Sequence, residues 1–450
     1  MADGTARSEA LRVALTSYRS KPHSGGQGVY VRHLSRALAD LGHHVEVFSG
    51  PPYPQLDDDI ALTRVPSLDL YREPDPFRRP ALREFRDRTD VLEYALMCTA
   101  GFPEPRTFST RVLKLLAPRS GEFDVVHDNQ TYGPALLRLP GLGLPLVGTV
   151  HHPISVDRRL ALAAAPLRKK LQTRRWYGFV RTQARVARQV PFNVTPSRSS
   201  GDDAIRDFGM SEEQLSVVPI GVDTERFRPR GPREPGRVVS LCSADVPLKG
   251  LTVLLRAFAA VAHAGSLTVV TKPTPAAEKL VAELGIAHRV SFVSGLDDDA
   301  VAELVARAEV AAVPSLYEGF SLPAVEAMAS GTALIASDTG ALPEVVGRDG
   351  TAGVLVPPGD ASALAAALGT LLRDPARRAA LGAAARARAE ERFGWHATAR
   401  ATVEVYRRAI ADFGPPAHAP SEPGRPRAGT LGRADTSPAG LGGPKKGDRC

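Results

Sequence analysis

The sequence contains little cysteine. Its 450 residues include three cysteines, Cys98, Cys242 and Cys450, which lie far apart along the chain. An odd number of cysteines at such spacing excludes a disulfide framework and a thiolate zinc cluster. We therefore expect a reducing compartment and a cytoplasmic protein.

Long apolar runs are also missing. The longest stretch without Asp, Glu, Lys or Arg, residues 139–156, is interrupted by several glycines and prolines. A membrane-spanning helix needs about 20 continuous apolar residues, so none is predicted. The first ten residues are polar and of mixed charge, which argues against a targeting segment.

The positive charge is concentrated in one segment. The chain carries a formal net charge of +8, and residues 158–188 hold ten basic residues and no acidic ones. On a single helix, Lys170, Arg174, Arg181, Arg185 and Arg188 would share an arc of about 60°. This face is either the solvated side of an amphipathic helix on the first sheet, or a contact for an anionic acceptor or an anionic membrane surface. No nucleic-acid recognition motif accompanies it, so nucleic acid is not an expected partner.

Short β-branched runs alternate with helical periodicity along most of the chain. This alternation predicts an α/β protein with parallel sheets and helices on both faces. A stretch rich in proline, glycine and arginine interrupts the pattern, which then restarts. The predicted organisation is an N-terminal domain (1–222), a linker (223–236), a second domain (237–395), a last helix (396–414) and a disordered tail rich in proline and glycine (415–450).

A glycine-rich loop follows the first predicted strand, residues 11–17. Its sequence, Lys21-Pro-His-Ser-Gly-Gly-Gln-Gly28, lets backbone approach a ligand closely, and the next helix would offer free N–H groups to a phosphate. The spacing differs from the GxGxxG of dinucleotide-binding folds. Ligand contact and a simple tight turn both stay open for this loop.

A second motif spans residues 314–331 and reads PSLYEGFSLPAVEAMASG. Pro323 is suited to the first helical position, so residues 319–322 would present backbone amides at a helix N-terminus. Glu318 precedes this helix and Glu326 lies about one turn inside it. Carboxylates accept pairs of hydroxyl hydrogen bonds, which suits a ribose diol and a hexose diol. The motif therefore predicts a metal-free site for a sugar diphosphate.

Two acidic triplets, Asp57–Asp59 and Asp297–Asp299, invite comparison with a metal-binding DxD motif. The second triplet opens a helical pattern, where aspartate acts as a cap, and the first follows a proline-rich loop. We therefore expect no metal site and no cofactor.

The second motif resembles the E-x7-E signature of the family-4 retaining glycosyltransferases of GT-B fold. Residues 11–412 carry further resemblances to that family. The resemblance implies two Rossmann-like domains facing a central cleft, with a C-terminal helix crossing back to the first domain. The segments that carry it are Ser24–Val31, Thr149–His152, Val218–Asp223, Pro247–Gly250, Gly340–Glu344 and Phe393–Trp395.

The resemblance implies a role for each motif residue. Glu326 would bind the ribose hydroxyls, Glu318 the donor sugar, and Lys249 with the loop amides the diphosphate. His151 would lie where donor meets acceptor, whereas His152 is expected at the surface. The implied catalytic residues are His151, Lys249 and Glu318; donor contacts come from Gly25, Gly26, Lys249, Lys272, Arg289, Glu318, Gly319, Phe320, Ser321, Leu322 and Glu326; Gln27, His151, Arg181 and Arg185 face the acceptor.

One departure from the family concerns a cation. The family usually carries an arginine five or six residues before the loop lysine, where this chain has Ser243 and Ala244. Stabilising a diphosphate leaving group without a metal depends on fixed positive charge. We hypothesise that Lys272 or Arg289 replaces the arginine; the plain alternative for Lys272 is a strand-end residue.

The sequence thus predicts a retaining hexosyltransferase that uses a nucleotide-diphosphate sugar. The acceptor would be a small molecule, of inositol-phosphate type or otherwise anionic, or a lipid-linked molecule, with peripheral contact to the inner membrane face. Two alternatives stay open: a nucleotide-sugar epimerase of the same architecture, and a catalytically weak sugar-nucleotide-binding subunit.

Overall fold

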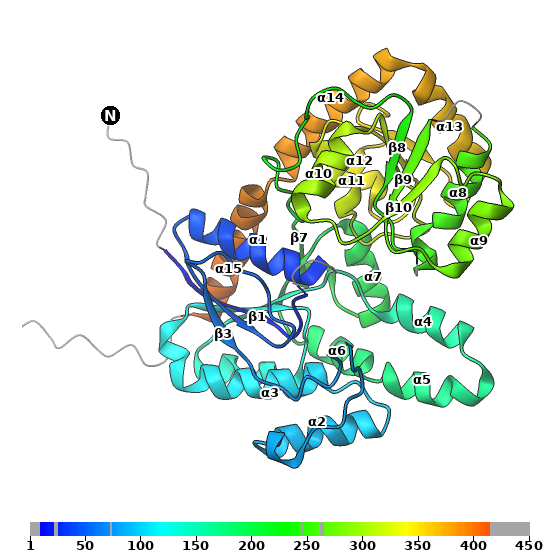
Figure 1. Ribbon diagram of the computed structural model, residues 1–450. Coiled ribbons are helices and arrows are strands. Elements are labelled where there is room, and N and C mark those ends of the chain that lie inside the picture. The colour runs from blue at the N-terminus through cyan, green and yellow to red at the C-terminus, as the bar shows by residue number, and fades with distance from the viewer. Residues whose placement is uncertain (1–9, 22–25, 73, 245, 262–264, 415–450) are drawn as a thin grey trace, which may run out of the picture. The chain divides into compact units, whose positions relative to one another are not determined.

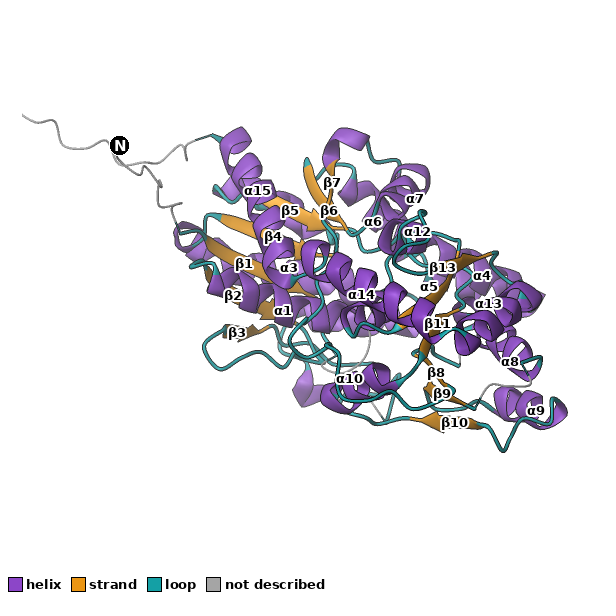
Figure 2. Cartoon of the chain, turned by 90° about the horizontal axis from the view of Figure 1, so that it is seen from above, coloured by secondary structure: helices purple, strands orange, loops and turns teal. Residues whose placement is uncertain are grey.

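Two parallel β-sheets, each covered by helices on both faces, make up the computed structural model (Figure 1; sheets orange in Figure 2). The structure describes residues 10–21, 26–72, 74–244, 246–261 and 265–414, which belong to one compact unit. We call the first sheet with its helices the first lobe, and the second sheet with its helices the second lobe. The predicted disordered tail, 415–450, lies outside the described residues.

The first sheet has seven strands in the order β3-β2-β1-β4-β5-β6-β7. The central strands are apolar and buried on both faces, as expected for a parallel sheet between two helical layers. The edge strand β3 was not predicted, because it is short and half-exposed. The strands are β1 Arg12–Ser17, β2 His44–Ser49, β3 Ala61–Arg64, β4 Val125–Asn129, β5 Leu146–Thr149, β6 Phe192–Thr195 and β7 Leu215–Val217.

The second sheet has six strands in the order β10-β9-β8-β11-β12-β13. Both sheets reverse their strand order beside the first strand of the sheet, which is the point where doubly wound folds bind ligands. The strands are β8 Arg237–Ser240, β9 Ser266–Val270, β10 Val290–Val293, β11 Val310–Val313, β12 Ala333–Ser337 and β13 Val354–Val356.

The helices alternate with the strands, as the sequence predicts. In the first lobe they are α1 Gly26–Asp40, α2 Arg88–Cys98, α3 Glu104–Leu116, α4 Ser155–Ala164, α5 Lys170–Trp176, α6 Phe179–Ala187 and α7 Arg198–Phe208. The second lobe contains α8 Leu251–Ala259, α9 Pro275–Glu283, α10 Asp298–Arg307, α11 Leu322–Ala329, α12 Leu342–Val346, α13 Ala361–Arg373 and α14 Pro375–Arg392. The last helix is α15, Trp395–Phe413.

Helix α15 returns to the first lobe, which confirms the predicted crossing helix. Its buried face, including Trp395 and Tyr406, joins the apolar core formed by α1 and the first sheet. The Tyr406 hydroxyl lies 2.6 Å from Nδ1 of His127 in β4. Burial lowers the pKa of His127 to about 3, so this imidazole is neutral and links the helix to the sheet.

The predicted single helix over residues 170–188 is wrong. The segment forms α5 and α6, separated at Tyr177 and Gly178. The aromatic residues on either side of the break pack on one partner: the rings of Trp176 and Phe179 lie 5.3 and 5.0 Å from that of Phe102. Satisfying both contacts breaks the common cationic face into two.

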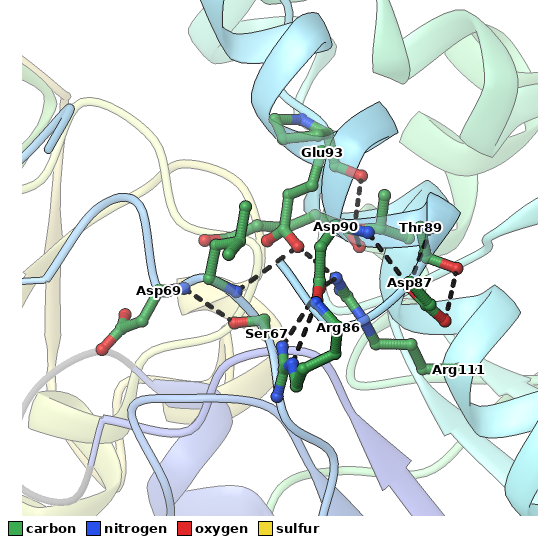
Figure 3. A network of polar contacts seen from close by, with 12 residues as sticks. Ser67, Asp69, Arg86, Asp87, Thr89, Asp90, Glu93 and Arg111 are labelled. Carbon is green, nitrogen blue, oxygen red and sulfur yellow. Dashed lines mark hydrogen bonds and ion pairs between the residues drawn. The ribbon is translucent and has the colours of Figure 1, made fainter. Parts of the chain in front are cut away.

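A buried ionic network anchors α2 to α3 (Figure 3). Arg111 of α3 contacts Asp90 at 2.6 Å and also pairs with Glu93, both in α2. Asp90 further accepts from the backbone and side chain of Arg86. Burial raises the pKa of Glu93, although Arg111 opposes the shift. Charges this deep are stable only as a paired set.

None of the described helices is both long enough and apolar enough to cross a membrane.

Candidate active site

A cavity of about 400 Å³ lies between loops of the two lobes. The loops that line it follow the carboxyl ends of β5, β6, β8 and β11, which is where ligands bind in open parallel sheets. The first lobe contributes Gln27, His151, His152, Pro196 and Ile220, and the second lobe contributes Val246, Leu248, Lys249, Tyr317, Glu318, Gly319, Phe320, Leu322 and Pro323.

Lys249 and Glu318 meet at this cavity. Lys249 Nζ lies 2.9 and 3.0 Å from the two carboxylate oxygens of Glu318, and the Ser315 hydroxyl donates to the same carboxylate at 2.7 Å. Gly250 brings the two loops together: its φ is +70°, and a Cβ there would overlap the carbonyl oxygen of Pro314. The structure thus joins two predicted site residues that are 69 positions apart.

The loop Gly319–Leu322, here called the donor loop, precedes α11. Ser321 caps the helix by accepting from the N–H of Ala324, and Pro323 is the second helical residue rather than the predicted first. Within the described part of the chain, the N–H groups of the donor loop have no hydrogen-bond partner. Free amides at a helix N-terminus favour an anion such as a diphosphate.

Glu326 lies one turn inside α11 and is partly buried. Burial, and next to it the charge of Asp298, raise the pKa of its carboxyl from 4.5 to about 7. No hydrogen bond to this carboxylate is found among the described residues. An ionised carboxylate in this position needs donors that the described residues do not supply, and the paired hydroxyls of a ribose would supply them.

His151 follows β5 and is held on several sides. Its Nε2 lies 2.7 Å from Oδ1 of Asn129, and its ring packs edge-on against that of Tyr30 at 4.7 Å. Burial lowers the pKa of His151 to about 3, so the ring is neutral. Because Oδ1 accepts, Nε2 carries the proton and the Nδ1 lone pair remains for a hydroxyl of the substrate.

The residues that fix His151 were missed by the sequence reasoning. Asn129 also donates to Ser17 Oγ at 3.3 Å, and Gln130 contacts the backbone of both histidines, accepting from the His151 N–H and donating to the His152 carbonyl. Gln130 adopts a φ of +56°, a strained conformation for a residue other than glycine. Their position in the sequence could have identified them, because polar residues at the carboxyl end of a buried strand lie where parallel sheets bind ligands.

The glycine loop is only partly described. Gly25 lies outside the described residues, and Gly26 begins α1. Gln27 lines the cavity. At Gly28 a Cβ would overlap the carbonyl oxygen of Lys21, so this position requires glycine for packing.

The two proposed replacements for the missing arginine lie at opposite edges of the second sheet. Lys272 follows the carboxyl end of β9 and is exposed, and the neighbouring Thr271 hydroxyl accepts from the N–H of Ala244. Arg289 precedes β10, at the amino edge, where it donates to the carbonyl of Val261. The four-residue strand β10 thus separates Arg289 from the carboxyl edge of the sheet, where the cavity lies.

Arg181 and Arg185 do not line the cavity. They lie on the exposed face of α6, whereas Val180, Gln183 and Val186 on the opposite face are buried. The side chain of Gln183 points to the loop that follows β4, where it donates to the carbonyls of residues 130 and 131. The structure thus does not bring the two arginines to the acceptor side of the cavity.

The acidic triplets serve protein contacts. Asp297 caps α10 by accepting from the N–H of Ala300 at 2.8 Å, as predicted, and Asp298 pairs with Arg226 at 3.2 Å. Asp59 pairs with Arg36 at 2.7 Å. Among the described residues no group of three or more metal-ligating side chains is found.

Sequence profiles of two families match the chain. The profile described as Glycosyltransferase Family 4 matches residues 24–226, and the profile described as Glycosyl transferases group 1 matches residues 236–374. These ranges correspond to the first and second lobes.

Several known proteins resemble the chain over most of its length. The MMP alpha-(1->4)-mannosyltransferase of Mycolicibacterium hassiacum is 57% identical, covering 89% of this chain and 99% of that protein. The D-inositol 3-phosphate glycosyltransferase of Xylanimonas cellulosilytica is 32% identical, covering 88% and 97%. Among solved structures, sucrose-phosphate synthase from Thermosynechococcus elongatus has a TM-score of 0.66 at 25% identity, covering 89% of this chain and 100% of that one.

Proposed function

The chain belongs to the group 1, family 4 glycosyltransferases of GT-B fold, and we propose that it transfers a mannosyl group from a nucleotide-diphosphate sugar to the 4-hydroxyl of a sugar acceptor, with retention of configuration. Two features support this proposal. The relative at 57% identity is named for an alpha-(1->4) mannosyl linkage. Loop amides, Lys249 and the carboxylate of Glu318 meet at the cavity, and Glu326 follows in the same helix that the donor loop precedes, which suits a sugar diphosphate.

Each group has a role in that transfer. The donor-loop amides and Lys249 stabilise the charge that develops on the diphosphate as its bond to the sugar C1 breaks. Glu318, which now pairs with Lys249, accepts hydroxyls of the donor sugar, and Glu326 accepts those of the ribose. The acceptor oxygen bonds to C1 on the same face, and its proton passes to the departing phosphate oxygen. No carboxylate nucleophile is needed.

The Lys249–Glu318 pair beside free loop amides carries the proposal most directly. The test is a transfer assay with mannose and glucose linked to UDP, GDP or ADP, and with mannosides or inositol phosphate as acceptors. Mannosyl transfer to a mannoside in the wild type, lost in Lys249→Ala and kept in Lys279→Ala, supports it. Lys279 is a matched control because it is 77% exposed and remote from the cavity lining.

The same assay decides between this proposal and its alternatives. Transfer to inositol phosphate but not to mannosides would indicate that this protein uses the acceptor for which the relative at 32% identity is named. Donor binding without any transfer would indicate the catalytically weak subunit. The relatives reported above are named as transferases or synthases, and none of them favours the epimerase.

We further propose that the segment around α5 contacts an anionic surface. Leu167 and Leu171 are 85% and 77% exposed, and they lie among the exposed cations Arg168, Lys169 and Arg174. Apolar side chains flanked by cations suit an anionic membrane interface. Sedimentation with phosphatidylglycerol vesicles, lost in Leu171→Glu, supports this contact; equal recovery in the supernatant with and without vesicles contradicts it.

A further inference from the structure

The N-terminus of α7, a first-lobe helix, is capped in part by its own Ser197, which accepts from the N–H of Ser200, and in part by the second lobe. The two carboxylate oxygens of Glu344 accept from the N–H groups of Arg198 and Ser199, at 2.9 and 2.8 Å. The first N–H groups of a helix have no partner within the helix, and negative charge is stabilised there. The cap of α7 is therefore complete only when the two lobes meet.

The same turn of α7 holds the donor loop. Ser197 Oγ donates to the carbonyl oxygen of Gly319 at 2.6 Å, and Ser200 Oγ lies 2.8 Å from that oxygen. Both serines are buried. In a trans peptide the C=O and the following N–H point in opposite directions. Anchoring the Gly319 carbonyl therefore turns the N–H of Phe320 away from α7, where none of the described residues accepts a hydrogen bond from it.

The approach of the two lobes leaves no room for a side chain at Gly319. A Cβ there would lie 2.8 Å from Ser200 Oγ and 3.3 Å from the carbonyl oxygen of His151. The other side of the loop is fixed to the segment that carries Glu344, because the Ala341 N–H donates to the Glu318 carbonyl at 2.9 Å. The loop is thus held between α7 and the start of α12.

We propose that Ser197, Ser200 and Glu344 are positioning residues that form an interlobe latch, which orients the donor-loop amides for the diphosphate when the lobes come together. The latch rests on the proposed function, since that function supplies the diphosphate. It couples two events: closing the lobes completes the cap of α7, and the capped α7 fixes the donor loop. Changes in the first lobe should consequently weaken nucleotide binding in the second.

The experiment measures lobe distance and nucleotide affinity together. Spin labels on the exposed native Cys98 and on a Lys279→Cys substitution, with Cys450→Ser, report the interlobe distance. The nucleotide probes are UDP and GDP, each titrated by calorimetry. The latch variants are Glu344→Gln and the double substitution Ser197→Ala with Ser200→Ala. Two substitutions at exposed sites serve as matched controls. Asp202→Asn on α7 makes the same chemical change as Glu344→Gln, and Ser362→Ala makes the same change as the serine substitutions.

The expected result is a longer, broader distance distribution in both latch variants, with or without nucleotide. The dissociation constant of the bound nucleotide should rise about tenfold, as expected when hydrogen bonds to a charged group are lost. Controls should match the wild type, and Ser197→Thr, which keeps a hydroxyl, should restore most of the affinity.

Wild-type distances and affinity in both latch variants would overturn the latch. The failure of the proposed function is distinguishable from this outcome. If neither UDP nor GDP binds to the wild type, the proposed function is contradicted, while the distances measured without nucleotide still test the latch.

Discussion

Replacing Glu326 by glutamine should make the protein more stable and less able to bind its donor. The pKa of this carboxyl is raised from 4.5 to about 7, mainly by burial. Below pH 4.5 the carboxyl is protonated in both the folded and the unfolded chain, so it does not make the free energy of unfolding depend on pH. Between pH 4.5 and 7 only the unfolded chain ionises, so the free energy of unfolding falls as pH rises, by about 3 kcal/mol in total at most.

Urea unfolding at two pH values measures this difference. We expect Glu326→Gln to exceed the wild type by up to about 3 kcal/mol at pH 8, and by less than about 1 kcal/mol at pH 5. Glu278→Gln, the same change at an exposed position of α9, should leave the difference near zero at both pH values. If Glu326→Gln changes the free energy of unfolding equally at pH 5 and pH 8, or lowers it at pH 8, the raised pKa of Glu326 is refuted.

The nucleotide provides a second readout of the same carboxyl. Ribose hydroxyls that donate to Glu326 stabilise its ionised form and lower its pKa. Binding near pH 7 should therefore release protons, which calorimetry in two buffers of different ionisation enthalpy detects. Glu326→Gln should bind the nucleotide more weakly and release no protons. Equal proton release from the wild type and the variant would show that the protons come from a group other than Glu326.

Three further predictions concern other parts of the chain. Arg111→Leu should lower the free energy of unfolding by about 3–5 kcal/mol, because among the described residues it leaves buried Glu93 without a cation and leaves Asp90 paired with Arg86 alone; urea unfolding close to that of the wild type would be inconsistent with the network. Asn129→Asp should raise the pKa of His151, so that kcat/KM falls about tenfold more between pH 8 and pH 5.5 in this variant than in the wild type, whose own profile falls with the protonation of Glu326; parallel profiles of the two proteins would contradict a role of Asn129 in setting the charge of His151. Lys272→Ala should lower turnover less than Lys249→Ala but still measurably, and wild-type turnover in Lys272→Ala would end the idea that it replaces the family arginine.

Local patterns in the sequence were sufficient to predict many of the strands and helices and the donor motif, but not the short edge strand β3. Residues such as Pro323 and Ser321 act through their nearest neighbours, and Asp297 caps its helix as its position indicates. Glu318 and Lys249 lie 69 positions apart, and their meeting followed from the family resemblance rather than from spacing.

Where the prediction from the sequence and the structure differ, contacts distant in the chain decided the structure. Spacing treats residues 170–188 as one helix, but the packing of Trp176 and Phe179 on Phe102 breaks it. Arg289 was assigned by charge alone, although a residue before a strand lies at the edge opposite the cavity. No local signal joins Glu344 to α7, because that contact exists only between the lobes.

The proposed reaction is retaining mannosyl transfer to a sugar 4-hydroxyl. It is tested most directly by incubating the protein with a nucleotide-linked mannose of α configuration and a mannoside acceptor, and by determining the product by NMR. We expect a new α-(1→4) linkage. A β-linked product, a different linkage position, or no transfer from any of the nucleotide sugars would contradict it.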